Sequence, residues 1–71
     1  MEVRKLKIFI NGKEEVLHDG CFLAELIDRK GFGADSVIVE YNYELVKSED
    51  WPGIALKEND RLEILRFVGG G

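Results

Sequence analysis

Residues 5–17 read KLKIFINGKEEVL, and they carry the clearest structural signal in the chain. Apolar residues alternate with others from Leu6 to Ile10, which is the two-residue period of a β-strand. Asn11-Gly12 follows at once, and such a pair between extended segments is a strong hairpin signal because both central residues of a type I′ turn need positive φ. We therefore predict a strand, a tight turn and a second strand.

A helix is predicted after this hairpin. Its apolar face would be made by four residues at helical spacing: Phe22, Leu23, Leu26 and Ile27. Glu25 and Arg29 lie four residues apart, in the favourable order for a surface ion pair. Gly31 suits the left-handed conformation that follows many helix ends, and Asp19 could cap the start.

The second half of the chain is predicted to be mostly extended. The expected elements are a strand over 36–41, a turn at 42–43, a strand over 44–46, a loop over 48–53, a turn over 58–60 and a final strand over 61–68. This order favours an α+β domain with one mixed sheet of four to five strands packed on a single helix. The β-grasp, or ubiquitin-like, fold heads the small folds with that order. We predict a β-grasp domain over 1–68 and a flexible glycine tail over 69–71.

The composition excludes several classes of protein. Hydrophobic residues make up 45% of the 71 residues and charged residues 34%, which is typical of a folded globular chain. The formal net charge of −4 is unsuited to nucleic acid, and no apolar run is long enough to span a bilayer. A single Cys cannot build a disulfide framework. We therefore expect a cytoplasmic protein with no membrane or nucleic-acid partner.

The final predicted strand changes phase near its end. Leu62 and Ile64 should face the core, so Leu65 and Phe67 fall on the opposite face of the sheet. Two interpretations are open: the pair covers a second small apolar cluster, or it forms a partner-docking patch, because exposed apolar clusters mark interfaces. Three glycines follow at 69–71, and glycine is the residue that loses most conformational freedom on ordering. Such a tail is either loose or is gripped by a partner.

Six stretches, in this order, carry a resemblance to a known family. They are IFING at 8–12, LAELI at 23–27, VIVEYN at 37–42, ELVKSEDW at 44–51, NDRLEI at 59–64 and the terminal GG at 70–71. Over essentially its whole length the chain resembles the ubiquitin-like sulfur carriers, most closely those of thiamine biosynthesis (the ThiS type), with the small subunit of molybdopterin synthase (the MoaD type) as a related branch. The chain departs from the family pattern at Tyr43 and Asn59, where Gly is common, and at Cys21-Phe22, where Ser or Thr often opens the helix.

The resemblance implies a chemistry at the C-terminus. A ubiquitin-activating-like adenylyltransferase (ThiF-like) would use ATP to activate the terminal carboxylate of Gly71. A persulfide or sulfide donor would then convert it to a thiocarboxylate for a thiazole synthase (ThiG-like). Partner binding would involve Leu65, Phe67, Val68, Gly69 and Gly70. The protein would be a macromolecular co-substrate, not an enzyme, with no bound cofactor and no metal.

Other readings stay open. The same tail could serve molybdopterin synthesis or protein modification, or the domain could be a non-covalent β-grasp interaction module with inert glycines. Cys21 is expected to be a small buried residue, with a sulfur-relay thiol as the alternative. His18 has no Cys or His at ligand spacing, so we expect no metal site there. Trp51 is expected to pack under its own loop, with an interface anchor as the alternative.

Overall fold

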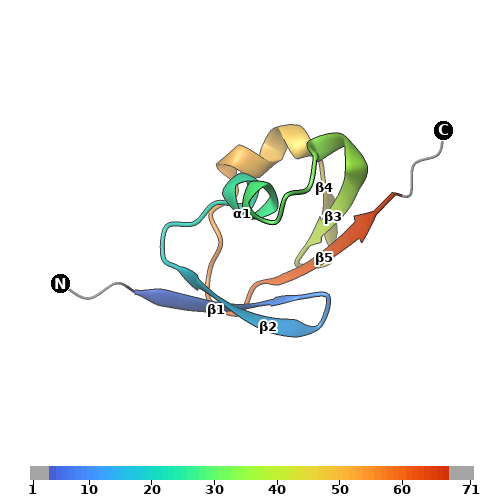
Figure 1. Ribbon diagram of the computed structural model, residues 1–71. Helices are drawn as coiled ribbons and strands as arrows, with labels where there is room; N and C mark the ends of the chain where they lie inside the picture. Colours follow the sequence, from blue (N-terminus) through green and yellow to red (C-terminus); the bar gives the residue numbers. More distant parts are fainter. Residues whose placement is uncertain (1–3, 68–71) are drawn as a thin grey trace.

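The computed structural model describes residues 4–67, which form a five-stranded mixed sheet with one α-helix on one side (Figure 1). The strands are β1 (Lys5–Ile10), β2 (Lys13–His18), β3 (Val37–Tyr41), β4 (Glu44–Val46) and β5 (Arg61–Arg66). The helical segments are α1 (Leu23–Arg29) and two short 3-10 segments, η1 (Ala34–Ser36) and η2 (Ser48–Gly53). The strand order is β2-β1-β5-β3-β4, and only the β1–β5 pair is parallel. This arrangement confirms the predicted α+β β-grasp fold.

The N-terminal hairpin forms as predicted. Ile10 pairs with Lys13 across the turn, and the two turn residues have positive φ angles of 52° at Asn11 and 83° at Gly12. The second predicted turn, Asn42-Tyr43, also joins two antiparallel strands. The 48–53 segment, predicted as a loop, is the 3-10 segment η2. The final strand is shorter than predicted, because β5 ends at Arg66.

The start of α1 differs from the prediction. Phe22 is the N-cap residue and no side chain caps the helix, so the cap proposed for Asp19 is wrong. The Phe22 side chain is also 40% exposed, so it does not share the buried face of the helix. Backbone bonds to residues 54–56 hold this end instead: Leu23 N–H donates to the Ile54 carbonyl at 2.8 Å, and Phe22 forms an isolated bridge with Ala55.

The rest of α1 agrees with the sequence pattern. Arg29 Nη2 lies 2.6 Å from Glu25 Oε2, which confirms the predicted surface pair. Gly31 follows the helix with φ of 78°, as a left-handed residue after a helix end. Within residues 4–67, no helix is long and apolar enough to cross a membrane.

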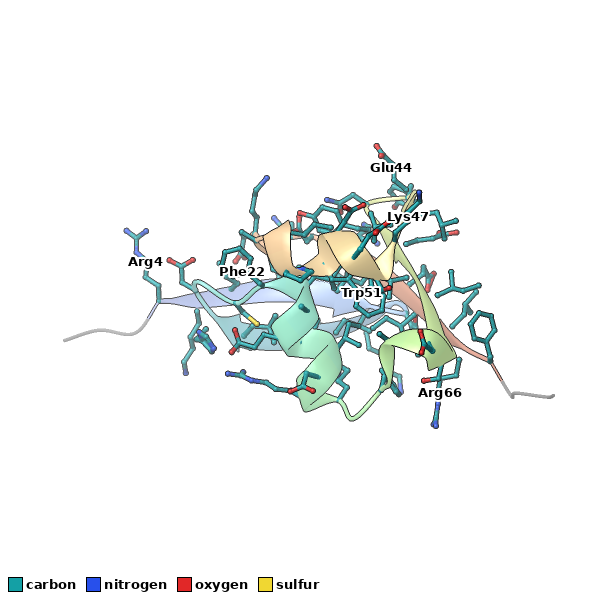
Figure 2. All side chains as sticks on the ribbon, turned by 90° about the horizontal axis from the view of Figure 1, so that it is seen from above. Arg4, Phe22, Glu44, Lys47, Trp51 and Arg66 are labelled. Atoms are coloured by element: carbon teal, nitrogen blue, oxygen red, sulfur yellow. The ribbon has the colours of Figure 1, made fainter. Side chains whose placement is uncertain are left out.

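The core lies between α1 and the side of the sheet that faces it. It is made by Ile8, Ile10, Cys21, Leu23, Leu26, Ile27, Val37, Val39, Trp51, Leu56, Leu62 and Ile64. Trp51 of η2 is buried, and its indole N–H donates to the Val46 carbonyl at 3.4 Å (Figure 2). The expected packing of Trp51 under its own loop is therefore confirmed.

Among the charged side chains of residues 4–67, that of Asp60 is buried. Asp60 lies directly before β5. Its carboxylate accepts three hydrogen bonds: from the Tyr41 hydroxyl at 2.8 Å, from Asn42 Nδ2 at 3.1 Å and from the Lys57 backbone N–H at 2.8 Å. Burial, together with the hydrogen bond to Asp60, raises the pKa of Tyr41 to about 12. The carboxylate thus ties the turn before β5 to the end of β3.

We predict that Asp60→Ala destabilises the fold by about 3 kcal/mol, because three donors lose an ionised acceptor and two of them belong to the β3–β5 junction. Denaturant unfolding measures this. Asp35→Ala removes an exposed carboxylate from η1 and serves as the control, with an expected change within about 0.5 kcal/mol. Equal effects of the two variants would contradict the role given to Asp60.

Candidate functional site

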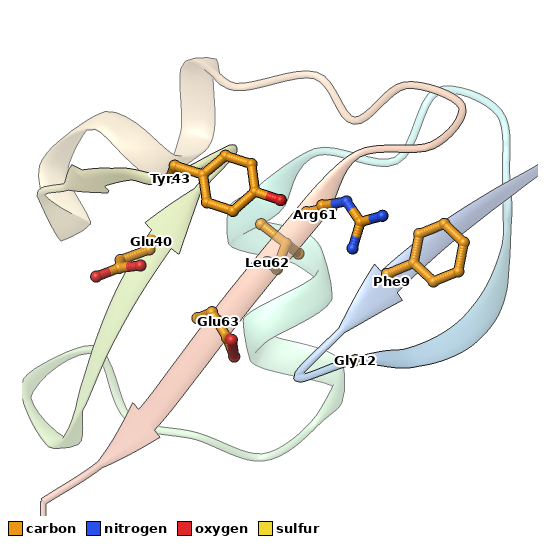
Figure 3. Close-up of a pocket in the computed structure, with 7 residues that line it drawn as sticks. All are labelled: Phe9, Gly12, Glu40, Tyr43, Arg61, Leu62 and Glu63. Carbon is orange, nitrogen blue, oxygen red and sulfur yellow. The ribbon is translucent and has the colours of Figure 1, made fainter.

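The side of the sheet opposite α1 carries no helix among the described residues, and we call it the outer face (Figure 3). Residues that pair across antiparallel strands project to the same face. Leu65 therefore shares the outer face with Ile38, its partner on β3, and Glu63 shares it with Glu40. In Figure 3, α1 lies behind β5 and these carboxylates project forward.

An apolar patch occupies the outer face beside the end of β5. It consists of Ile38, Leu45, Leu65 and Phe67. Leu45 is 70% exposed, Leu65 59% and Phe67 50%, while Ile38 is half-buried. Leu65 and Phe67 are thus not buried in a second core: the cluster that they form with Ile38 and Leu45 is open to solvent. Exposed apolar clusters of this kind often mark interfaces.

The chain leaves β5 in a defined direction. The side chain of Asn11, in the β1–β2 turn, makes two hydrogen bonds to β5. Its Oδ1 accepts from the Ile64 backbone N–H at 2.8 Å, and its Nδ2 donates to the Ile64 carbonyl at 3.2 Å. Beyond the strand, Phe67 N–H donates to the Ser36 carbonyl at 2.9 Å. Figure 2 shows Arg66 at the opposite end of the molecule from Arg4. The Asn11-Gly12 pair predicted only a turn, and no pattern in the sequence indicated this contact between Asn11 and Ile64.

The remaining predicted site residues lie outside the described segment. They are Val68, Gly69, Gly70 and Gly71. The functions assigned to them therefore stay predictions, and the structure contributes the position and direction of the residues that precede them.

A strained aromatic lies in the turn after β3, at the other end of the β3–β5 pair from Leu65. Tyr43 has φ of 73° in the β3–β4 turn, and its side chain is 78% exposed. A left-handed backbone is unusual for a bulky residue and costs about 1–2 kcal/mol. Figure 3 shows the ring above β5, directed toward Arg61, whose guanidinium lies 5.1 Å from the centre of the Phe9 ring. Tyr43 therefore places a strained and exposed ring on the outer face near the beginning of β5.

Cys21 and His18, which the sequence raised as a possible relay thiol and a possible metal ligand, lie far from the apolar patch at the end of β5. Cys21 is fully buried, as expected, and burial, with a smaller contribution from Glu25, raises the pKa of its thiol, which does not suit a sulfur relay. No ligand partner was expected for His18. In the structure, one potential ligand atom from each of His18, Cys21 and Glu25 lies within 4.8 Å of the other two.

Comparison with known proteins decides the family. The family model described as "ThiS family" matches residues 2–71. The chain belongs to the ThiS family. This confirms the resemblance seen in the sequence. A crystal structure titled thiamine biosynthesis protein (ThiS) from Geobacter metallireducens superposes with a TM-score of 0.78 at 29% identity, covering 93% of this chain and all of that one. A solution structure of a thiamine biosynthesis protein from the same organism gives a TM-score of 0.77 at 29% identity, covering 93% of this chain and 88% of that one.

Sequence relatives of this ThiS-family chain fall into two kinds. The uncharacterized protein ycf40 of Trieres chinensis is 33% identical over 63 residues, which cover 89% of this chain and 86% of that protein. Thiazole synthases of Paramagnetospirillum magneticum and Magnetococcus marinus are each 33% identical over 66 residues, covering 93% of this chain. The chain spans only 20% of the length of either thiazole synthase.

We predict that Tyr43→Gly stabilises this ThiS-family domain by about 1 kcal/mol, because glycine adopts positive φ without strain and the exposed ring makes few contacts. Denaturant unfolding measures the change. Tyr43→Ala keeps a Cβ on the strained backbone, so it should leave stability within about 0.5 kcal/mol of the parent. Equal stabilities of the glycine and alanine variants would show that the backbone strain at Tyr43 is not significant.

Proposed function

We propose that this ThiS-family chain is a sulfur carrier of thiamine biosynthesis. Its Gly71 carboxylate is adenylated by a partner enzyme and converted to a thiocarboxylate, which donates sulfur for thiazole synthesis. The observation that carries the proposal is the ThiS-family match over residues 2–71, which includes the glycines at 69–71. The fold supports it, because β5 leads directly toward that segment from an exposed apolar patch.

The chemistry explains why a partner and ATP are required. A terminal carboxylate has a pKa of about 3.5, so it is ionised at neutral pH and resists nucleophiles. Attack of the carboxylate on the α-phosphorus of ATP releases pyrophosphate and gives an acyl adenylate. Sulfide then forms the C–S bond while AMP leaves; a persulfide donor gives an acyl disulfide, from which a second thiol releases the thiocarboxylate. Here the chain is a co-substrate and the partner is the catalyst.

Glycines at 69–71 suit a group that must enter two different enzyme sites in turn. They have no side chains to obstruct a narrow channel, and they allow close backbone approach by the partner. Ordering three such residues costs about 3–6 kcal/mol. Burial of Leu65 and Phe67 against a partner returns about the same amount. The apolar patch and the tail therefore form one proposed docking unit.

The thiazole synthase relatives support the choice of acceptor. In both, the part that resembles this chain makes up 20% of the protein and is joined to a polypeptide about four times its length. Covalent joining gives two domains a high effective concentration, which favours transfer between them. We propose that a thiazole synthase receives the sulfur from this chain, through a contact like the one between the two parts of these relatives.

Gly71→Ala tests the chemistry of the tail. We expect a normal fold but a loss of thiocarboxylate formation of about tenfold or more, because the added methyl group must enter a site shaped for glycine. Deletion of residues 70–71 should abolish the product. The measurement is product formation with ATP, the adenylyltransferase and sulfide. Normal turnover by Gly71→Ala, or full partner affinity and function after the deletion, would favour the non-covalent module instead.

Phe67→Asp tests the docking patch. We predict at least a tenfold loss of affinity for the adenylyltransferase, about 1.4 kcal/mol, because a buried charge replaces an aromatic contact. Stability should change by less than about 0.5 kcal/mol, since Phe67 is half exposed.

Val16→Asp is the matched control for Phe67→Asp. Val16 is 60% exposed and pairs with Lys7 on the outer face, but on β2 at the other edge of the sheet. Titration calorimetry should show unchanged partner affinity for this variant. A similar affinity loss in both variants, or a large fall in the unfolding temperature of Phe67→Asp, would contradict the assignment of the patch.

A further inference from the structure

Three side chains with metal-binding atoms meet where β2 leads into α1. They are His18 at the end of β2, Cys21 before the helix and Glu25 in its first turn. Their ligand atoms all lie within 4.8 Å of one another. In Figure 1 this connection is on the N-terminal side of the molecule, away from the end of β5. The cluster is therefore separate from the proposed docking unit.

The two closest contacts of the His18 ring suit the tautomer with its proton on Nδ1. Nδ1 lies 3.0 Å from the Asp19 carbonyl, which only accepts, so Nδ1 is the protonated nitrogen. Nε2 lies 3.0 Å from Arg29 Nη2, which only donates, so Nε2 presents a lone pair. This is the neutral tautomer in which histidine binds a metal. A backbone carbonyl on the other nitrogen is the usual outer contact of such a ligand.

A cationic group already occupies the space between two of these ligands. Arg29 Nη2 is 2.6 Å from Glu25 Oε2 and 3.0 Å from His18 Nε2, and the two acceptor atoms are 3.5 Å apart. The Arg29 side chain is 52% exposed. It can therefore swing into solvent on its flexible stem and leave both acceptors directed at the same point.

We propose that His18 Nε2, Cys21 Sγ and a Glu25 carboxylate oxygen bind a divalent transition metal, with Zn²⁺ as the best match. Zinc takes nitrogen, sulfur and carboxylate ligands at about 2.0–2.3 Å, and three protein ligands leave its fourth position for water. On binding, the Cys21 thiol loses its proton to solvent, a Zn–S bond forms, and the Arg29 guanidinium moves away from the site. His18 Nε2 and Glu25 Oε2 are already 3.5 Å apart, so binding mainly requires the Cys21 sulfur, within 4.8 Å of ligand atoms of both residues, to approach to less than about 4 Å.

Cobalt(II) is the probe for this site, because its d–d and sulfur-to-metal absorption bands report tetrahedral geometry and a thiolate ligand. We expect one Co²⁺ per metal-free chain, displaced by Zn²⁺. Cys21→Ser should abolish the sulfur-to-metal band. His18→Gln and Glu25→Gln should each weaken Zn²⁺ binding about tenfold or more, and Arg29→Ala should strengthen it by removing the competing cation.

Glu15→Gln is the matched control for these variants. Glu15 is a nearby carboxylate on β2, but it pairs with Lys30 at 2.8 Å and is not part of the cluster, so its loss should leave the metal affinity unchanged. Zn²⁺ should also raise the unfolding temperature of the parent but not of His18→Gln, which keeps the result interpretable if Cys21→Ser folds poorly.

No stoichiometric binding by the parent would overturn the proposal, as would binding that survives both His18→Gln and Glu25→Gln. In either case the cluster is a polar network held by Arg29. These measurements need no partner enzyme, so their outcome is independent of the proposed sulfur chemistry.

Discussion

Strand β5 joins the two halves of the sheet, the β2–β1 hairpin and the β3–β4 hairpin. This strand lies in the middle of the sheet, parallel to β1 and antiparallel to β3. The Asp60 carboxylate holds its beginning, and the Asn11 side chain holds it at Ile64 through both the N–H and the carbonyl. Because Phe67 directly follows β5, the placement of this strand sets where the proposed docking unit begins.

The two faces of the sheet differ in burial. The face toward α1 supplies most of the buried core, and the outer face holds the apolar patch and the strained Tyr43. An exposed aromatic in a left-handed conformation opposes folding, and strain of this kind concentrates at functional sites. In the proposed chemistry the catalytic groups belong to the partner enzymes, and this domain supplies the surface and the C-terminus.

Local patterns in the sequence were sufficient to predict much of the fold. The Asn11-Gly12 turn, the Glu25–Arg29 pair and the change of phase at Leu65 depend on residues close together in the chain, and all three are present in the structure. The start of α1 was predicted wrongly because tertiary backbone contacts to residues 54–56 fix it, and no capping side chain marks it.

Two features of the sites lay beyond what the sequence alone could reveal. The bonds from Asn11 to Ile64 join residues 53 positions apart, so no local pattern indicates them. His18, Cys21 and Glu25 come from a strand end, a connection and a helix turn. Their convergence depends on how the chain bends at residues 19–22, which the residue spacing does not specify.

The most direct test of the central claim is the intact mass of the protein after incubation with ATP, its adenylyltransferase and sulfide, with fragmentation to locate any change. The account predicts a species in which one oxygen has been replaced by sulfur, confined to the C-terminal carboxylate of Gly71 and absent without ATP. An unmodified terminus with demonstrably active partners would contradict the sulfur-carrier account and would leave a β-grasp domain that binds its partners without covalent change.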